Sequence, residues 1–80
     1  MVELDYTKVL EDCLKNISKA KKQLYDLFSA QMFSICLRYS KNQEDAEDIF
    51  QQSFIKVFLK LHTVNEPASL PGWIKSIFIR

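Results

Sequence analysis

The chain has 80 residues, of which 48% are hydrophobic, 26% are charged and ten are aromatic (six Phe, three Tyr and one Trp). That length suits one domain, and the density of apolar residues excludes a disordered chain. A single Gly and two Pro supply too few turns for a many-stranded β-sandwich or barrel. The composition therefore favours an all-α fold.

The net charge of +1 conceals an uneven distribution of charge along the chain. Residues 41–50 hold one lysine against four acids, a balance of −3, whereas residues 51–80 hold four basic residues against one acid, a balance of +3. Residues 1–40 are nearly balanced, with six basic and five acidic side chains. A net charge near zero thus does not exclude a nucleic-acid partner, because the basic segment also carries aromatic residues.

The two cysteines, Cys13 and Cys36, follow no metal-binding or disulfide pattern, and no secretory leader precedes them. We therefore expect both to be buried thiols outside any disulfide, in a reducing cytoplasm. His62 is the only histidine, so we expect no zinc site and no cofactor. No apolar run approaches the ~20 residues of a membrane span, and no membrane partner is expected.

Apolar residues recurring at steps of three and four predict a compact bundle of four helices. The first is short and covers about residues 5–16, and the second runs from Ser18, its candidate N-cap, to about Tyr39. The main apolar stripe of the second helix is predicted to be Ala20, Leu24, Leu27, Phe28, Ile35 and Tyr39. Further apolar residues lie on its opposite side, namely Ala30, Phe33 and Leu37. This helix is therefore expected in the middle of the bundle.

The third helix has the most regular apolar pattern in the chain. Asn42, three residues before Asp45, is its candidate N-cap, and acids in the first turn complement the helix dipole. Its core face is predicted to be Ala46, Ile49, Phe50, Ser53, Phe54, Val57, Phe58 and Leu61. After a polar break, a fourth helix is predicted from Leu70–Pro71. It buries Trp73, Ile74, Ile77 and Phe78, and is expected to continue beyond Arg80.

The face of the third helix opposite its core stripe carries Glu44, Asp48, Gln51, Gln52, Ile55 and Leu59. Ile55 and Leu59 are apolar where water is expected. They indicate either a docking strip for a partner helix or a surface covered by the first helix, and both can hold together. The acids alone are typical of a stabilised helix end.

Basic and polar side chains recur from one edge of the third helix, through the following loop, to the last helix: Lys56, Lys60, His62, Asn65, Lys75 and Arg80. They fit a surface that faces a phosphate backbone, with loop groups near base edges, and fit scattered solubilising charge equally well. His62 alone is more typical of a helix end than of a base reader. Trp73 opens a buried stripe, which favours a core role over base stacking.

No catalytic motif is present. The chain lacks a glycine-rich phosphate loop and a nucleophile elbow, and the lone histidine has no Ser or Cys at motif spacing. The paired acids of the third helix lie at a helix end without an expected cleft. We therefore expect that the protein is not an enzyme.

Two motifs resemble region 2 of bacterial RNA polymerase sigma factors of the extracytoplasmic-function group. The family's D-A-E-D, hydrophobic pair and Q-E-x-F appear as Asp45-Ala46-Glu47-Asp48-Ile49-Phe50-Gln51-Gln52-Ser53-Phe54. Its later W-[LI]-x-x-I appears as Trp73-Ile74-Lys75-Ser76-Ile77. The resemblance covers about residues 20–80 and implies the all-α sigma region 2 fold, with a three-helix core over about residues 18–80.

The resemblance implies two partners and a division of labour between them. The third helix would dock on the clamp coiled coil of the largest subunit of core RNA polymerase through Asp48, Gln51 and Gln52. The helical wheel adds Glu44, Ile55 and Leu59. The following loop and last helix would bind the single-stranded non-template strand of the promoter minus-ten element, with one base flipped into a pocket. That nominates Lys60, His62, Asn65, Ser69, Lys75 and Arg80. The family also brings an anti-sigma factor as a further expected partner.

Three positions depart from the family pattern. Gln52 stands where Glu is common, Ser76 where Arg is frequent, and Arg80 where Asn is frequent. The family's second domain, a helix-turn-helix that reads the minus-thirty-five element, is not found in these 80 residues. We therefore expect an isolated promoter-melting domain. The alternative is a helical protein-interaction module that does not bind DNA and uses Ile55 and Leu59 for another partner.

Overall fold

A computed structural model describes residues 5–79 and contains four α-helices and two short 3-10 helices. They are α1 (Thr7–Leu14), α2 (Ser18–Tyr39), α3 (Gln43–Lys60), η1 (Leu61–Thr63), η2 (Pro67–Ser69) and α4 (Leu70–Phe78). No strand occurs in this described part of the chain, and the predicted all-α fold is confirmed. Arg80 and the first four residues of the predicted domain lie outside the described residues.

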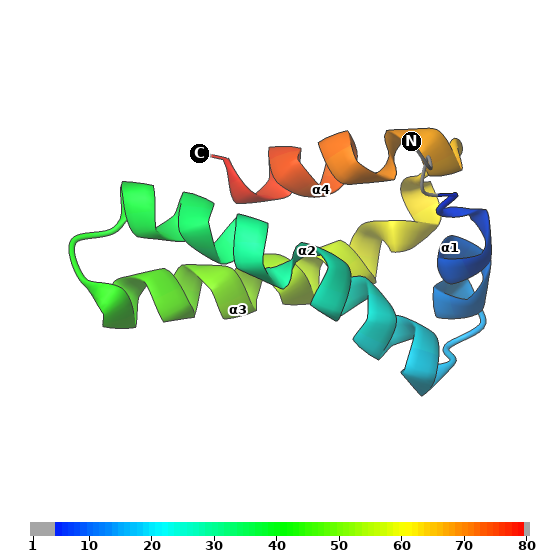
Figure 1. The fold of residues 1–80 in the computed structure, drawn as a ribbon, viewed down its shortest axis with the longest axis horizontal. Helices are drawn as coiled ribbons and strands as arrows, with labels where there is room; N and C mark the ends of the chain where they lie inside the picture. Colours follow the sequence, from blue (N-terminus) through cyan, green and yellow to red (C-terminus); the bar gives the residue numbers. More distant parts are fainter. Residues whose placement is uncertain (1–4, 80) are drawn as a thin grey trace.

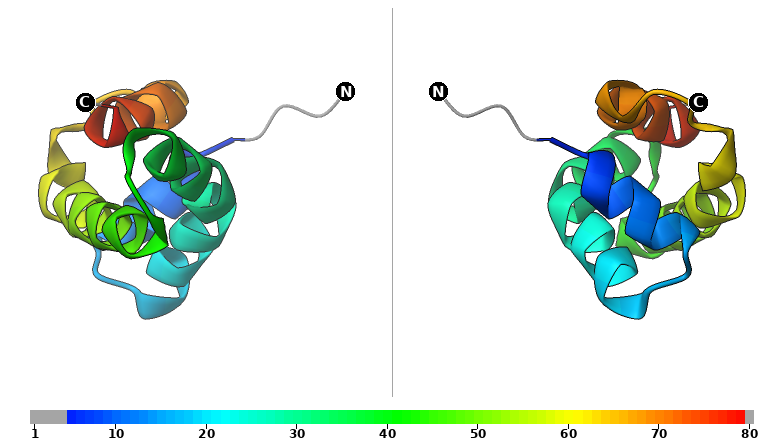
Figure 2. Two further views of the ribbon diagram at one scale, coloured as in Figure 1. Left: turned by 90° about the vertical axis from the view of Figure 1, so that its left-hand side faces the viewer. Right: turned by 90° about the vertical axis from the view of Figure 1, so that its right-hand side faces the viewer.

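The long helices α2 and α3 form an antiparallel hairpin, and α4 returns alongside both of them (Figure 1). Views along the bundle show α2, α3 and α4 arranged around a common centre, with α1 crossing one end (Figure 2). At that end α1 packs on α2 and on the two 3-10 helices. The core therefore lies between the hairpin and α4, and α1 closes it at one end.

The first helix ends earlier than its apolar pattern predicts, at Leu14, because Asn16 takes a left-handed conformation with φ of 65°. The Asn16 N–H donates to the Cys13 carbonyl at 2.9 Å, and the Ile17 N–H donates to the Asp12 carbonyl at 3.0 Å. These two bonds form a Schellman motif, in which Asn is the usual substitute for Gly. The sequence predicted Ser18 as the N-cap of α2, and this prediction is wrong. Ile17 takes that position without a side-chain hydrogen bond, because the Schellman turn leads directly into the helix.

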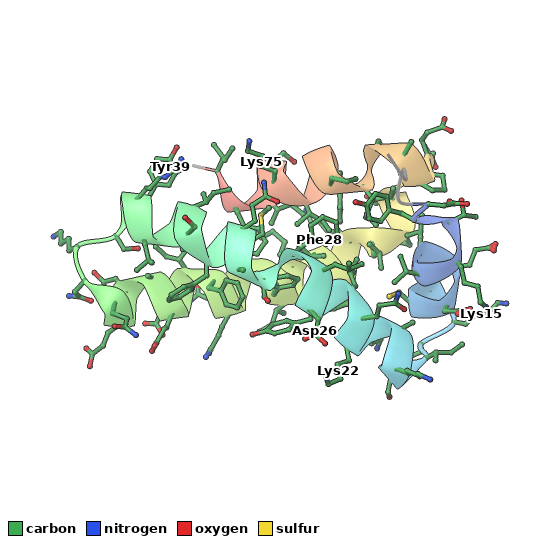
Figure 3. All side chains as sticks on the ribbon, viewed as in Figure 1. Lys15, Lys22, Asp26, Phe28, Tyr39 and Lys75 are labelled. Carbon is green, nitrogen blue, oxygen red and sulfur yellow. The ribbon has the colours of Figure 1, made fainter. Side chains whose placement is uncertain are left out.

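The buried face of α2 advances mainly in steps of four, as Ala20, Leu24, Phe28, Met32, Ile35 and Cys36. Leu27 was predicted for this face but is 43% exposed, because it lies about 100° away from Phe28 around the helix. Tyr39 was also predicted there and is 55% exposed, because α2 extends beyond the end of α4 (Figure 3). α2 packs against each of the other α-helices, as expected of a central helix.

The predicted buried faces of α3 and α4 are confirmed. Every residue of the predicted core face of α3 is buried or half-buried, as are Trp73, Ile74, Ile77 and Phe78. α4 ends at Phe78, and Ile79 after it is extended, whereas the pattern predicted a helix that runs past Arg80. The Asn42 side-chain Oδ1 accepts a hydrogen bond from the Asp45 N–H at 2.8 Å, so Asn42 caps α3. Cys13 and Cys36 are both buried, as predicted. The pattern gave no sign of Val64, which is buried between the two 3-10 helices.

Phe54 offers the most direct test of this core. It is 4% exposed, and its ring lies within 5.0–6.1 Å of those of Tyr25, Phe50, Phe58 and Phe78. We expect Phe54→Ala to lower the free energy of unfolding by about 3–5 kcal/mol through the cavity it leaves. Denaturant unfolding followed by circular dichroism measures the change. The neighbouring Ile55→Ala is the matched control and should cost less than about 0.5 kcal/mol. Similar losses from both variants would contradict the assignment of the core face.

Candidate functional site

The six residues predicted for the outer face of α3 do share one exposed surface, here called the docking face. They are Glu44, Asp48, Gln51, Gln52, Ile55 and Leu59, and all are exposed. Fifteen positions separate the first from the last, which a helix converts to roughly 22 Å. The acids occupy the end of α3 nearest the hairpin turn, and the two aliphatic residues occupy the other half.

No helix in the described residues covers the aliphatic part of the docking face. Ile55 is 60% exposed and Leu59 is 69% exposed. The alternative that the first helix packs on them is wrong, because the Schellman turn at Asn16 sends α1 across the end of the bundle onto α2 and the 3-10 helices. Two adjacent aliphatic side chains on an otherwise polar face are typical of a protein-binding surface.

A groove with a volume of about 560 Å³ borders the docking face between α2 and α3. α2 supplies Tyr25, Ser29, Ala30 and Phe33 to its walls, and α3 supplies Gln43, Glu47, Phe50 and Gln51. The ring of Tyr25 lies 5.8 Å from that of Phe50, which holds it at the groove wall. Gln51 therefore belongs both to the docking face and to the groove.

Of the α2 wall, the sequence pattern pointed to Ala30 and Phe33 as a second apolar side of the helix, but it did not predict a groove there. The pattern of α2 alone assigns Tyr25 to neither the core nor a surface, because its position follows from the packing of α2 on α3. On α3, the side-chain amide of Gln43 donates to the Glu47 carboxylate at 3.4 Å, which links two further groove residues.

Four of the six predicted DNA-binding residues lie along the connection from α3 to α4 and are exposed. Lys60 ends α3, His62 lies in η1 and Ser69 ends η2, with Asn65 between the 3-10 helices. The Ser69 hydroxyl donates to the Glu66 carbonyl at 2.7 Å, which orders the start of α4. Lys75 lies farther along α4, away from this connection (Figure 3). The remaining candidate, Arg80, lies outside the described residues.

His62 lines a hollow of about 270 Å³ where η1 meets the junction of α1 and α2. The other lining residues are Cys13, Leu14, Asn16, Lys21, Phe58 and Leu61. Burial raises the pKa of the Cys13 thiol, so the thiol stays protonated at neutral pH. Trp73 is half-buried and packs against the core, as favoured from the sequence.

Comparison with known proteins assigns a family to this arrangement. The family model described as Sigma-70 region 2 matches residues 24–80. The chain belongs to the sigma-70 region 2 family. The match covers α2 from residue 24 onward, all of α3 and α4, the docking face and the connection from α3 to α4. α1, its turn and the first residues of α2 precede the match.

Two curated relatives have sigma-factor names. Over 48 residues the chain is 35% identical to the RNA polymerase sigma factor SigV of Bacillus subtilis. This aligned segment covers 60% of this chain and 29% of SigV. Over 47 residues it is 36% identical to the ECF RNA polymerase sigma factor SigE of Mycolicibacterium smegmatis, covering 59% of this chain and 18% of that protein. The aligned part thus spans less than a third of either relative. No solved structure gave a significant match.

Two further observations concern membrane spans and metal sites. Within residues 5–79, no helix combines the length and the apolar character needed to cross a bilayer. The same residues contain no group of three His, Cys, Asp or Glu side chains placed to hold a metal ion.

The Asn42 cap sets the first turn of α3, and its removal gives a direct prediction. Asn42→Ala leaves the Asp45 N–H without its acceptor and should lower the free energy of unfolding by about 1 kcal/mol. Asn42→Asp keeps an acceptor oxygen at the same position and should lose much less. Urea unfolding of the three proteins measures both effects. Equal losses in the two variants would show that the cap hydrogen bond does not stabilise α3.

Proposed function

We propose that the domain acts in transcription initiation by binding core RNA polymerase through α3 and promoter DNA through the connection from α3 to α4. The observation that carries the proposal is the uncovered docking face, with Ile55 and Leu59 exposed beside Gln51, Gln52 and Asp48. The family assignment supports it, since both relatives carry the name of an RNA polymerase sigma factor. The partner segment on the polymerase is the clamp coiled coil of the largest subunit.

A helical partner suits the shape and the chemistry of the docking face. One helix packs on another by burying an apolar strip, and Ile55 and Leu59 supply such a strip one turn apart. Gln51 and Gln52 offer amide donors and acceptors at its border, and Asp48 offers a carboxylate to a basic partner residue. The polar border then contributes orientation and specificity, while burial of the aliphatic pair contributes most of the affinity.

Promoter binding requires cationic groups for phosphates and hydrogen-bonding groups for unpaired bases. Lys60 and Lys75 supply charge, and His62, Asn65 and Ser69 supply polar side chains on the connection between them. Extracting one base from the duplex stack costs a few kcal/mol, which phosphate contacts and polymerase binding together offset. We propose that these residues hold the single-stranded minus-ten element of the non-template strand. Arg80 joins them in this proposal.

The role is one of binding and not of covalent chemistry. The docking face also defines where a regulator would act. An anti-sigma factor that covers α3 would compete with the polymerase for the same aliphatic pair, because one strip cannot be buried against two partners at once.

Removal of two polar residues tests the polymerase contact. We expect Asp48→Ala/Gln51→Ala to weaken binding to core polymerase about tenfold, or about 1.4 kcal/mol, because two border contacts are lost. The helical circular dichroism and the unfolding midpoint should not change, since both side chains are exposed. Glu11→Ala on α1 is the control, an exposed acid outside the docking face. Unfolding of the double variant, or wild-type affinity, would contradict the proposal.

The DNA contact is tested with a fluorescent single-stranded minus-ten oligonucleotide and the polymerase-bound domain. Binding should weaken with salt, and Lys60→Gln/Lys75→Gln should reduce the slope of log K against log salt by about 1.4, since two phosphate contacts are lost. Polymerase affinity of this variant should equal that of the wild type. If no oligonucleotide binds while the α3 interface remains intact, the domain is a protein-interaction module of another kind.

A further inference from the structure

The turn between α1 and α2 concentrates more positive charge than any segment used above. Residues 13–25 contain Lys15, Lys19, Lys21 and Lys22 and no acid. The near balance of residues 1–40 conceals this segment, because all five acids lie outside it. We call residues 15–22 the lysine corner. Neither the docking face nor the basic connection from α3 to α4 includes any of these lysines.

The lysine corner has a fixed geometry. The Schellman motif at Asn16 ends α1 and starts α2 within three residues, so the backbone on both sides of the turn is helical. Lys15 occupies the C-cap of α1, and Lys19 and Lys22 lie one turn apart on the same side of α2. Figure 3 shows Lys15 at the end where α1 lies and Lys22 at the lower edge of α2, both away from Lys75. Lys21 lies about 160° from Lys19 around α2, so the charges are spread over the outer side of the turn on a fixed backbone.

Glu11, Asp12 and Asp26 lie next to the corner, but among the described residues only Asp26 forms an ion pair with one of its lysines. Lys22 forms an exposed ion pair with Asp26 at 3.0 Å, and the Lys21 ammonium donates to the Asn16 side-chain oxygen. Among the described residues, Lys15 and Lys19 form no ion pair. The first turn of α2 holds no acid, so its positive dipole end adds to the lysine charges. At least two cations remain for an external anion.

The lysine corner adjoins the residues proposed to meet the promoter. Lys21 and Asn16 line the hollow of about 270 Å³ together with His62 of η1. One basic and polar surface thus continues from the connection between α3 and α4 onto the start of α2. A nucleic-acid strand that leaves His62 would meet the lysine corner next.

We propose that the lysine corner is a second DNA-binding surface, which contacts the phosphate backbone of duplex DNA next to the melted segment. This inference rests on the proposed function, since it extends the promoter contact onto α1 and α2. Lysines recognise phosphates as point charges and carry no sequence information, so the contact is independent of base sequence. The duplex is favoured over a single strand because the corner holds no aromatic side chain on which bases stack.

The chemistry of α2 favours DNA over an anionic membrane surface. A helix that lies on a bilayer buries its apolar face among lipid chains. In α2 that face is already occupied, since Ala20, Leu24 and Phe28 are in the protein core. Leu14 next to the corner and Ile17 within it are exposed, but they form no continuous helical stripe. The hollow beside them instead offers an amide, an ammonium and an imidazole, which are hydrogen-bonding groups for phosphate oxygens.

Two matched charge-removing variants test the proposal. Lys15→Gln/Lys19→Gln removes two exposed lysines of the corner, and Arg38→Gln/Lys41→Gln removes two exposed cations near the turn between α2 and α3. Binding of each to a fluorescent duplex without a minus-ten sequence is measured by anisotropy across a salt series. The corner variant should bind on the order of tenfold more weakly at low salt, with a salt slope smaller by about 1.8. The control should stay close to wild type.

The remaining measurements separate this proposal from the function on which it rests. Equal duplex affinity of the two variants would overturn the proposal that the lysine corner binds DNA. A corner variant that loses binding to phosphatidylserine vesicles but keeps its binding to the duplex would also overturn it. The corner variant should keep its affinity for core polymerase. A corner effect on the duplex with no effect of Lys60→Gln/Lys75→Gln on single-stranded DNA would instead count against the proposed minus-ten contact alone.

Discussion

The contact between Phe50 and Phe54 on α3 is the interaction on which the bundle depends. Their ring centroids lie 5.1 Å apart. Both rings contact Tyr25 of α2 and Phe78 of α4, at distances from 5.0 to 5.9 Å. One pair of residues on α3 therefore joins α3 to both α2 and α4. Buried aromatic rings in offset and edge-on contact gain both from burial and from ring geometry. In a chain of 80 residues, where little surface is available to bury, such a hub carries a large share of the stability.

The same hub determines which surface is left for partners. Because α3 turns Phe50 and Phe54 inward, the helical period places Asp48, Gln51 and Ile55 outward. The position of Tyr25 against the two rings also builds the α2 wall of the groove beside the docking face. A core substitution such as Phe54→Ala would thus disturb the groove as well as the stability. Surface substitutions on the docking face leave the hub intact, which is why binding and folding can be measured separately.

The sequence predicted the parts of the molecule that local physics determines. The core face of α3 follows from its own periodicity, and the Asn42 cap follows from the spacing of Asn42 and Asp45. The exposure of Tyr39 depends instead on where α4 ends, which α2 alone does not encode. The end of α1 depends on the left-handed conformation of Asn16, a conformation that an asparagine adopts only in some contexts. The lysine corner was missed because its charge was averaged over 40 residues, with acids that lie elsewhere in the fold.

The separation of opposite charges gives the small bundle its capacity for more than one contact. The acidic first turn of α3 lies at the hairpin end, and the lysine corner lies at the end that α1 closes (Figure 1). α3 alone has 18 residues, a length of roughly 27 Å. The Debye length at physiological salt is about 8 Å, so neither field reaches the other. If the acids and lysines were neighbours, they would pair with each other. The surface would then have no strongly charged region, in keeping with the net charge of +1. At opposite ends, the acids stay available to a basic protein surface and the lysines to a phosphate backbone.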